Sequence, residues 1–406
     1  MRPRLLLFAL LILPALPTQG QHNFKILHAF GLGNDGGGVW SSVTLDKAGN
    51  VYGTTSGGGA YNGGTVFRLT PGTDGRWREA ILHSFGGGND GAGPFGGVTA
   101  DSKGNLYGPT ETGGGGYTYG TVYRLSPGSN GWRETVLHRF GRRDHDGSPY
   151  GNLVMDERRN LYGTAASAAF ELSPGPKGWT ETILHQFTGK NGDGIDPMAG
   201  PIHDAAGNLY GTTDLGGGSK VCDDGCGTVW ELSPPALGSG SQGWTEHILH
   251  RFGVNDDFSF PGVGQLAMDH DGNLYGAVLG GKYIAGVIYK LSPVFATSGT
   301  SETWHETVLY NFTGRSDGGY PEGVILDAAG NLYGICGVGG AYGEGTVFEL
   351  SPQRDGTWQY TLLHTFTGQD GAEPVANPTL GPDSKLYGTT ATGGPHGGGV
   401  VFQLTP

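Results

Sequence analysis

Short runs of apolar and β-branched residues alternate with clusters of glycine, proline, asparagine and aspartate along almost the whole chain. After the first twenty residues, no stretch keeps the 3.6-residue apolar period of an amphipathic helix. Short apolar runs bounded by turn-forming residues are typical of β-strands. The pattern therefore predicts an all-β protein.

The apolar runs belong to a repeat, whose clearest copy spans residues 101–140. Its marker, Asn-Leu-Tyr-Gly or a close variant, occurs seven times and places a tyrosine at Tyr52, Tyr107, Tyr162, Tyr210, Tyr275, Tyr333 and Tyr387. The period is about 56 residues, and a period of this size indicates a unit that buries its core by stacking on copies of itself.

Each copy contains four predicted strands, which we name a to d. In the second copy they span residues 97–100, 106–110, 120–125 and 132–140. The pair Ser126-Pro127 is expected to end strand c, because proline has no N–H for a ladder hydrogen bond. Four antiparallel strands in a unit of this length are typical of a propeller blade.

The two ends of the chain complement each other. The strand d motif Leu-His-x-Phe first occurs at residues 27–30, before any strand a, whereas the last copy ends at strand c, residues 401–404. Pairing of the N-terminal strand with the last blade would close the ring and leave no open edge. We expect a closed seven-bladed β-propeller of twenty-eight strands, and an open β-solenoid is the alternative.

Residues 1–20 differ from the rest of the chain. Arg2 and Arg4 precede an apolar run at residues 5–16, which is too short to span a bilayer and is typical of a secretory signal peptide. Residues 21–406 show no break in composition. We therefore expect a signal peptide at 1–20, a single propeller domain at 21–406, a secreted or periplasmic location, and no membrane span after cleavage.

The net charge and the cysteines further restrict the possible classes of function. The formal net charge is −13, and the chain has no basic cluster, which argues against nucleic-acid binding. The 81 glycines recur at fixed places in the repeat, so we interpret them as turn and loop residues of an ordered monomeric ring. Cys222 and Cys226 are expected to form a local disulfide rather than a metal pair, and Cys336 to be buried.

The repeat as a whole resembles a known family. Gly-Asn-Leu-Tyr-Gly-Thr-Thr, a Gly-Gly loop, Gly-Thr-Val-Phe-x-Leu-x-Pro and Trp-x-Glu-Thr-x-Leu-His-x-Phe are similar to the GloVer repeat of bacterial choice-of-anchor tandem repeat proteins. The Asp-x-x-Gly-Asn-Leu-Tyr core also resembles NHL-type propeller repeats. The family resemblance implies a surface or secreted bacterial protein of unassigned activity, usually with a C-terminal anchor. No anchor follows the last strand here, so free release or periplasmic retention is expected.

Residues that recur in every blade are expected to serve the blade. They include the marker tyrosines, the indoles that start strand d (Trp77, Trp132, Trp179, Trp244, Trp304 and Trp358) and the aspartates before the a–b turn (Asp46, Asp101, Asp156, Asp204, Asp269 and Asp327, with Gly381 in the seventh copy). The Leu-His-x-Phe histidines are His28, His83, His138, His185, His250 and His364, and Tyr310 replaces one. Strand d lies about 14 Å outside strand a, so no two of these histidines can share an ion. We predict a structural role for them and no metal site.

The d–a connections and the b–c loops should emerge on one face, which makes that face the expected binding surface. Its candidate ligand-binding residues are Trp40, Tyr61, Tyr117, Tyr119, Tyr150, Tyr283, Tyr320, Tyr342 and His396, with Phe95, Phe258 and Phe260 nearby. Aromatic side chains surrounded by glycine suit stacking on sugar rings. The same face carries Asp35, Asp90, Asp144, Asp146, Asp193, Asp256, Asp257, Asp317 and Asp370. No cofactor is expected, with calcium at these acidic loops as the alternative. The structural alternative is that the aromatics anchor the loops and the aspartates form turns.

Two blades depart from the repeat, since the third lacks the long glycine loop after Tyr162 and the fourth carries the two cysteines in an enlarged loop. A ligand site beside these loops is therefore expected.

No catalytic motif is present, and no catalytic residue can be named. The first hypothesis is a non-enzymatic protein that binds extracellular glycan or protein. The second is a polysaccharide hydrolase or lyase with an acidic site at the channel mouth, and the third is an envelope scaffold.

Overall fold

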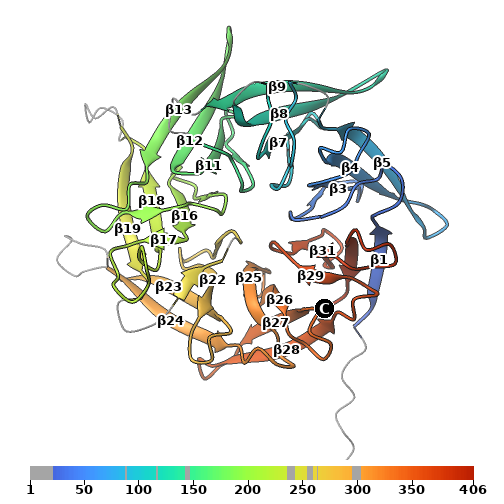
Figure 1. The fold of residues 1–406 in the computed structure, drawn as a ribbon. Coiled ribbons are helices and arrows are strands. Elements are labelled where there is room, and N and C mark those ends of the chain that lie inside the picture. Colours follow the sequence, from blue (N-terminus) through green and yellow to red (C-terminus); the bar gives the residue numbers. More distant parts are fainter. Residues whose placement is uncertain are drawn as a thin grey trace, which may run out of the picture.

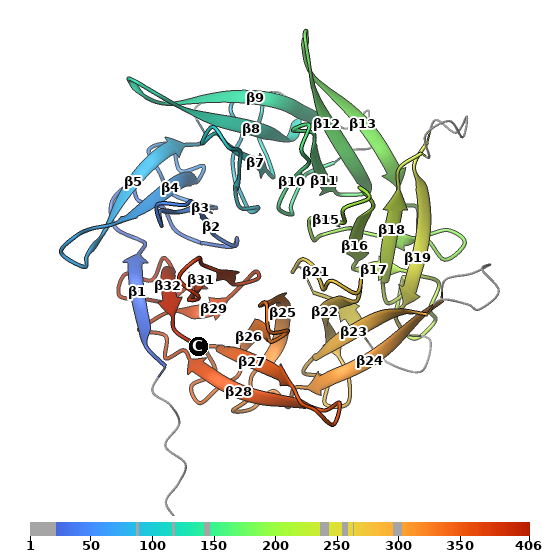
Figure 2. The ribbon, with the colours of Figure 1, turned by 180° about the vertical axis from the view of Figure 1, so that it is seen from behind.

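The chain forms a ring of seven blades around a central channel in a computed structural model (Figures 1 and 2). The structure describes residues 22–86, 89–115, 118–141, 147–235, 243–253, 259–262, 264–294 and 303–406. All the regular elements in these ranges are strands, so the predicted seven-bladed all-β propeller is confirmed. Within them no helix has the length and apolarity needed to cross a membrane. The predicted signal peptide, Tyr117, Asp144, Asp146, Asp256, Asp257 and Phe258 lie outside the described residues.

Twenty-eight of the 32 described strands make up the blades. Blade 1 contains β2 (Thr44–Leu45), β3 (Val51–Thr55), β4 (Thr65–Pro71) and β5 (Trp77–Ser84). Blade 2 contains β6 (Thr99–Ala100), β7 (Leu106–Thr110), β8 (Thr118–Gly128) and β9 (Gly131–Gly141). Blade 3 contains β10 (Val154–Met155), β11 (Leu161–Ala165), β12 (Ala168–Gly175) and β13 (Gly178–Gln186). Blade 4 contains β15 (Ile202–His203), β16 (Leu209–Thr213), β18 (Thr228–Ser233) and β19 (Thr245–Arg251).

The remaining three blades follow the same order. Blade 5 contains β21 (Ala267–Met268), β22 (Leu274–Gly280), β23 (Val287–Val294) and β24 (Thr303–Asn311). Blade 6 contains β25 (Gly319–Leu326), β26 (Leu332–Val338), β27 (Thr346–Pro352) and β28 (Trp358–Thr365). Blade 7 contains β30 (Thr379–Leu380), β31 (Leu386–Thr392), β32 (Val400–Leu404) and β1 (Phe24–Ala29). The short strands β14 (Gly194–Ile195), β17 (Leu215–Gly216), β20 (Ser259–Pro261) and β29 (Ala372–Pro374) belong to the loop face.

Several predicted strand bounds of blade 2 differ from those observed. Strand a is β6, Thr99–Ala100, and does not begin at residue 97. Strand c of blade 2 does not stop at Ser126-Pro127, because β8 continues to Gly128 with Pro127 opposite Trp132 of β9. The pairing of β7 with β8 ends at Leu125, so beyond that residue β8 has β9 as its only neighbour in the sheet. Proline is tolerated there because the edge side of the strand needs no ladder hydrogen bond.

The predicted closure of the ring is confirmed. β1 pairs antiparallel with β32, from Phe24 opposite Leu404 to Ala29 opposite Val400, so blade 7 takes its outer strand from the N-terminal side of the chain (Figure 1). Blade 7 is also tied to blade 1, since Thr379 Oγ1 donates a 2.6 Å hydrogen bond to the carbonyl of Val43. Residues more than 300 positions apart therefore complete the fold.

The marker Asn-Leu-Tyr-Gly fits between two blades. Its tyrosines are buried, and in blades 2, 3 and 5 they face the strand d indole of the following blade, as in Tyr107 and Trp179, whose rings lie 6.2 Å apart. The marker glycine lies under an aromatic ring of strand c: a Cβ on Gly211 would come within 2.3 Å of Trp230. The marker tyrosine therefore packs one blade on the next, and the marker glycine leaves room for the aromatic side chain of strand c within the blade.

The repeated aspartate holds the a–b turn, as expected. In blade 1 the Asp46 carboxylate accepts hydrogen bonds from the N–H groups of Ala48 and Asn50, from the Asn50 amide at 2.7 Å and from the Tyr52 hydroxyl at 3.0 Å. In blade 7 the residue that accepts from the marker hydroxyl is Asp383, two positions after Gly381. The missing aspartate is thus replaced from within the turn.

Candidate functional site

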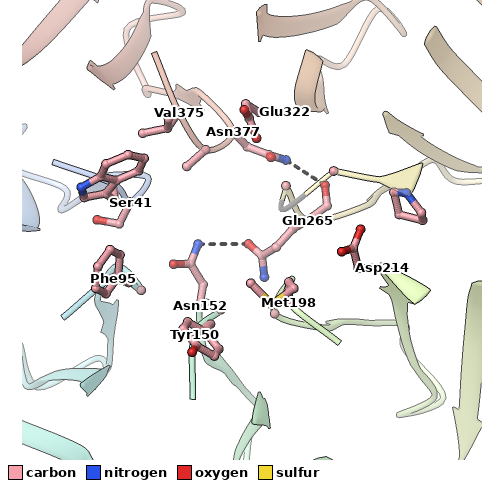
Figure 3. Close-up of a pocket in the computed structure, with 18 of the residues that line it drawn as sticks. Ser41, Phe95, Tyr150, Asn152, Met198, Asp214, Gln265, Glu322, Val375 and Asn377 are labelled. Carbon is pink, nitrogen blue, oxygen red and sulfur yellow. Dashed lines mark hydrogen bonds between the residues drawn. The ribbon is translucent and has the colours of Figure 1, made fainter. Parts of the chain in front are cut away.

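A cavity of about 500 Å³ lies at one end of the channel, where the d–a connections of all seven blades converge (Figure 3). Its volume is within the range of small-molecule sites, roughly 300–1,000 Å³. The lining is largely apolar, with a few convergent polar groups. We refer to it as the mouth pocket.

One repeat position supplies the rim of the mouth pocket. Each d–a connection has a proline, or Val39 in blade 1, and the next residue lines the pocket in every blade: Trp40, Phe95, Tyr150, Met198, Gly262, Glu322 and Val375. These residues are about 50 positions apart in the sequence and meet only because the blades form a ring. Alignment of the seven copies of the repeat could have found them, because this one position varies while the positions around it repeat.

Threonines of strand b hold the rim segments in place. Thr54 Oγ1 donates to the carbonyl of Gly96 at 3.1 Å, and Thr164 Oγ1 donates to that of Ala199 at 3.0 Å. Thr389 Oγ1 makes the corresponding bond to the carbonyl of Ser41 at 2.9 Å. In each case the threonine and the carbonyl belong to neighbouring blades, so the rim is built on the rigid part of the ring.

Aromatic side chains occupy much of the rim. Trp40 and Phe95 lie with ring centroids 6.2 Å apart, and the Tyr150 hydroxyl donates to Glu111 at 3.2 Å. Tyr320 also lines the pocket, and 47% of its surface is exposed. Its φ is 56°, a left-handed conformation that costs a non-glycine residue on the order of 1 kcal/mol. The equivalent residues before Val39 and Pro94 are Gly38 and Gly93.

Three side-chain amides form the floor of the mouth pocket. Asn152, Gln265 and Asn377 come from blades 3, 5 and 7 and meet across the channel (Figure 3). The Asn152 amide donates to Gln265 Oε1 at 3.2 Å, and the Asn377 amide donates to the backbone carbonyl of Gln265 at 2.9 Å. They close the channel and present polar atoms below the aromatic rim.

Two carboxyl groups also line the pocket, Glu322 on the rim and Asp214 at the end of β16 (Figure 3). Burial raises the pKa of Glu322 to about 7. Burial also raises the pKa of Asp214, and the neighbouring charge of Asp196 raises it further. Both shifts favour the neutral form of the carboxyl group. No described residue of the lining is a histidine. Sequence reasoning missed both acids.

The predicted ligand-binding aromatics divide into two groups. Trp40, Tyr150 and Tyr320 line the mouth pocket, as does Phe95. The b–c loop residues Tyr61, Tyr119, Tyr283, Tyr342 and His396 are not part of its lining. The two kinds of loop do share a face, because the d–a segment pairs with the end of strand b, for example Gly37 with Gly57 and Ala92 with Thr112. The glycine loops are therefore ordered by hydrogen bonds and lie around the pocket.

The loop aspartates serve the outer part of the ring. Asp370 accepts from the Thr367 N–H at 2.8 Å and lies 3.0 Å from His364 Nε2, and Asp317 accepts from the Thr313 N–H at 2.9 Å. Asp35, Asp90 and Asp193 likewise lie near the strand d histidines. None of these five aspartates lines the mouth pocket.

The structure joins Cys222 and Cys226 in a disulfide, with a Cα–Cα distance of 5.3 Å. The pair packs beside Phe252, in the core between blades 4 and 5. Neither cysteine lines the mouth pocket, and neither does the shortened blade 3 turn at residues 166–167, where the asymmetric loops had been expected to mark a site.

Thiol titration tests this disulfide. The protein should show one reactive thiol per chain after denaturation, from Cys336, and essentially none when folded, because Cys336 is fully buried and burial raises its pKa. Titration with a chromogenic disulfide reagent, with and without guanidinium, gives both counts. Three thiols in unreduced, denatured protein would rule out the disulfide.

Comparison with known proteins supports the fold. No curated protein matches significantly. YCF48 from Cyanidioschyzon merolae is 12% identical with a TM-score of 0.52, and the match covers 94% of this chain and 99% of that one. The extracellular domain of a hybrid two-component system from B. thetaiotaomicron is 12% identical with a TM-score of 0.51, over 94% of this chain and 41% of that one. Polysaccharide lyase Uly1 is 15% identical with a TM-score of 0.49, over 97% and 94%. The first two similarities, with TM-scores above 0.5, support the propeller architecture alone.

The family model for the Gloeobacter/Verrucomicrobia repeat matches residues 16–223 and 222–406. This match spans nearly the whole chain and all seven blades, and it confirms the resemblance found in the repeat pattern. The chain belongs to the Gloeobacter/Verrucomicrobia repeat family.

Proposed function

We propose that the protein binds a short, uncharged saccharide in the mouth pocket. The observation that carries this proposal is the combination of an aromatic rim with an amide floor in a cavity of about 500 Å³. Aromatic faces bind the C–H faces of sugar rings, while amides and neutral carboxyl groups exchange hydrogen bonds with hydroxyls. The terminal sugar of a saccharide has both an apolar C–H face and hydroxyl groups.

The exposure of Tyr320 supports this choice, because a tyrosine beside the pocket with 47% of its surface exposed offers a ring face for stacking. An uncharged ligand is favoured because the two lining carboxyl groups have raised pKa values and the described lining contains neither lysine nor arginine. An anionic sugar would therefore lack a cationic partner.

The proposal predicts which aromatics matter. Trp40→Ala and Tyr320→Ala should each weaken binding at least about tenfold, equivalent to about 1.4 kcal/mol, because each removes a stacking surface. Tyr342→Ala is the matched control: this tyrosine is 64% exposed on a b–c loop, lies outside the pocket, and should leave the affinity within about twofold. The measurement is a panel of neutral oligosaccharides on protein comprising residues 22–406, followed by isothermal titration calorimetry of the best ligand.

Three outcomes would count against saccharide binding at this pocket. The first is no saturable binding to any member of the panel. The second is loss of binding in Tyr342→Ala with retention in Trp40→Ala, which would move the site to the b–c loops. The third is turnover, measured as new reducing or unsaturated sugar ends and lost in Glu322→Gln, which would favour the polysaccharide-active enzyme.

A further inference from the structure

Histidine and glutamate of neighbouring blades meet at the outer seams of the ring. The strand d motif Trp-x-Glu-x-x-Leu-His carries both residues, and the histidine of one blade faces the glutamate of the next. The histidine Nε2 to glutamate oxygen distances are 3.6 Å for His28 and Glu79, 3.4 Å for His185 and Glu246, and 3.4–3.6 Å in two further seams. In these four seams the histidine meets a glutamate that sequence reasoning did not pair with it.

A d–a loop aspartate meets the histidine of the N-terminal strand and those of blades 1 and 3, and in two of these seams the three residues form a compact cluster. Between blades 7 and 1 the cluster is His28, Asp35 and Glu79, and between blades 3 and 4 it is His185, Asp193 and Glu246. Each cluster brings one imidazole nitrogen and two carboxylate oxygens within 4.8 Å of one another. We call them seam clusters 7/1 and 3/4.

The distances in seam cluster 7/1 suit a shared ion better than a hydrogen bond. His28 Nε2 lies 3.5 Å from Asp35 Oδ2 and 3.6 Å from Glu79 Oε2, beyond the usual 2.7–3.2 Å of an N–H···O bond. In a tetrahedral zinc site with bonds of about 2.0–2.1 Å, neighbouring ligand atoms lie about 3.3 Å apart. His28 Nε2 and Glu79 Oε1 are buried and have no hydrogen-bond partner.

The second carboxylate oxygens are held by the backbone, which aims the free oxygens at the histidine. Asp193 Oδ2 accepts from the N–H of Thr188 at 2.6 Å and from its hydroxyl at 2.7 Å, which leaves Oδ1 at 3.4 Å from His185 Nε2. In cluster 7/1, Asp35 Oδ1 accepts from the N–H of Gly31 at 3.2 Å. Such outer hydrogen bonds fix the ligands of protein metal sites.

Two seams of the same ring lack the glutamate, so they can be compared with the two seam clusters. Between blades 6 and 7, Phe24 takes its place and stacks on His364 at 3.9 Å, and His364 makes a 3.0 Å hydrogen bond to Asp370. Between blades 5 and 6, Tyr310 stacks on Tyr360 at 4.7 Å and donates to Asp317 at 3.2 Å. Where the glutamate is absent, an aromatic ring fills its space; a histidine–aspartate hydrogen bond also forms in the seam that keeps Glu134, between His83 and Asp90 at 3.1 Å.

We propose that seam clusters 7/1 and 3/4 each bind one divalent transition-metal ion of the zinc class. One imidazole nitrogen and two carboxylate oxygens supply three positions of a tetrahedral site, and water completes the fourth. The ligand side chains of cluster 7/1 are 12–23% exposed, so the ion can enter from solvent. Each ion bridges two blades and fastens the ring from outside, at the seam that closes it and at a second seam.

The test uses tag-free protein comprising residues 22–406, stripped with a chelator and then dialysed against micromolar zinc chloride. Elemental analysis should find two zinc ions per chain, and calorimetry should show the same stoichiometry. Glu79→Gln and Glu246→Gln should each lose one ion while keeping the size of the side chain, and Asp35→Asn serves as a second variant of cluster 7/1. Asp370→Asn is the matched control, since its seam has the histidine and aspartate but no glutamate, and it should retain both ions.

Several results would overturn the proposal. One is zinc uptake by the wild type no greater than that of the Glu79→Gln, Glu246→Gln double variant. Another is loss of an ion in Asp370→Asn. Uptake of calcium in place of zinc, abolished by Glu79→Gln, would refute the assignment to the zinc class. Circular dichroism of every variant establishes that lost binding does not reflect unfolding.

Discussion

Removal of residues 22–30 is expected to lower the melting temperature by about 10 °C or more. The deletion takes β1 from blade 7 and leaves β32 as an unpaired edge. It also removes Phe30, which is fully buried, and Phe24, which packs on Phe366 and Phe402. Deleting a single buried phenylalanine side chain costs about 3–5 kcal/mol, so losing the strand costs more. Each kcal/mol corresponds to about 2–4 °C in a domain of 150–250 residues, and to less in a larger one.

The control for this deletion is protein that begins at Asn23 and keeps β1. Differential scanning calorimetry compares the two proteins at equal concentration. A synthetic peptide of residues 22–31, added to the shortened protein, should restore part of the lost stability, because an extended peptide can add a strand to an exposed edge. Equal melting temperatures would mean that the ring does not depend on its N-terminal strand.

The closure of the ring could be predicted because every copy of the repeat has its strand motifs in the same order. Leu27 to Phe30 have the strand d motif without the preceding strands, and the last copy lacks that motif. Strand b was also predicted within its observed bounds, Leu106–Thr110, because the marker and its flanking turn define both ends. Strand a is shorter than expected, two residues in β6, because the glycines and prolines before it form the pocket rim and not a ladder.

The mouth pocket was only partly predictable. Trp40, Tyr150 and Tyr320 could be chosen as loop aromatics, but nothing local separates them from Tyr61 and Tyr342, which lie outside the pocket. The distinction is geometric: d–a connections lead to the innermost strand, whereas b–c loops lie further from the axis. Glu322 was overlooked because its importance comes from its place among six other rim residues.

The seam clusters show a second limit of prediction from the sequence. The strand d histidines diverge around the rim, and each described cluster contains one of them. The partners of each histidine are different residues across one seam, and not identical residues in different blades. His28 and Glu79 occupy different positions of the repeat, and only the packing of one blade on the next brings them together. Contacts between unlike repeat positions need the ring geometry.

Glu322→Gln is expected to stabilise the protein at pH 8 by about 3–4 kcal/mol and to have much less effect at pH 5. Burial raises the pKa of Glu322 to about 7, from 4.5 for an exposed glutamate. Between these values the folded state holds a proton that the unfolded state releases, so the wild type loses stability as the pH rises through this window. Each pKa unit corresponds to about 1.4 kcal/mol, which gives the expected size above pH 7. Glutamine carries no charge at any of these pH values and removes the loss.

Urea denaturation of both proteins at pH 5, 6, 7 and 8 measures this difference. Taking the difference at each pH cancels the titration of the other buried acids, such as Glu79 and Glu246, which both proteins share. Glu373→Gln is the matched control, since Glu373 lies in the neighbouring blade on the same face and is exposed. A difference that does not vary with pH would show that the Glu322 carboxyl is not held neutral in the folded protein. A rising difference would mean that the pocket offers a neutral carboxyl group below pH 7, which can donate a hydrogen bond to a sugar hydroxyl, and a charged one above it.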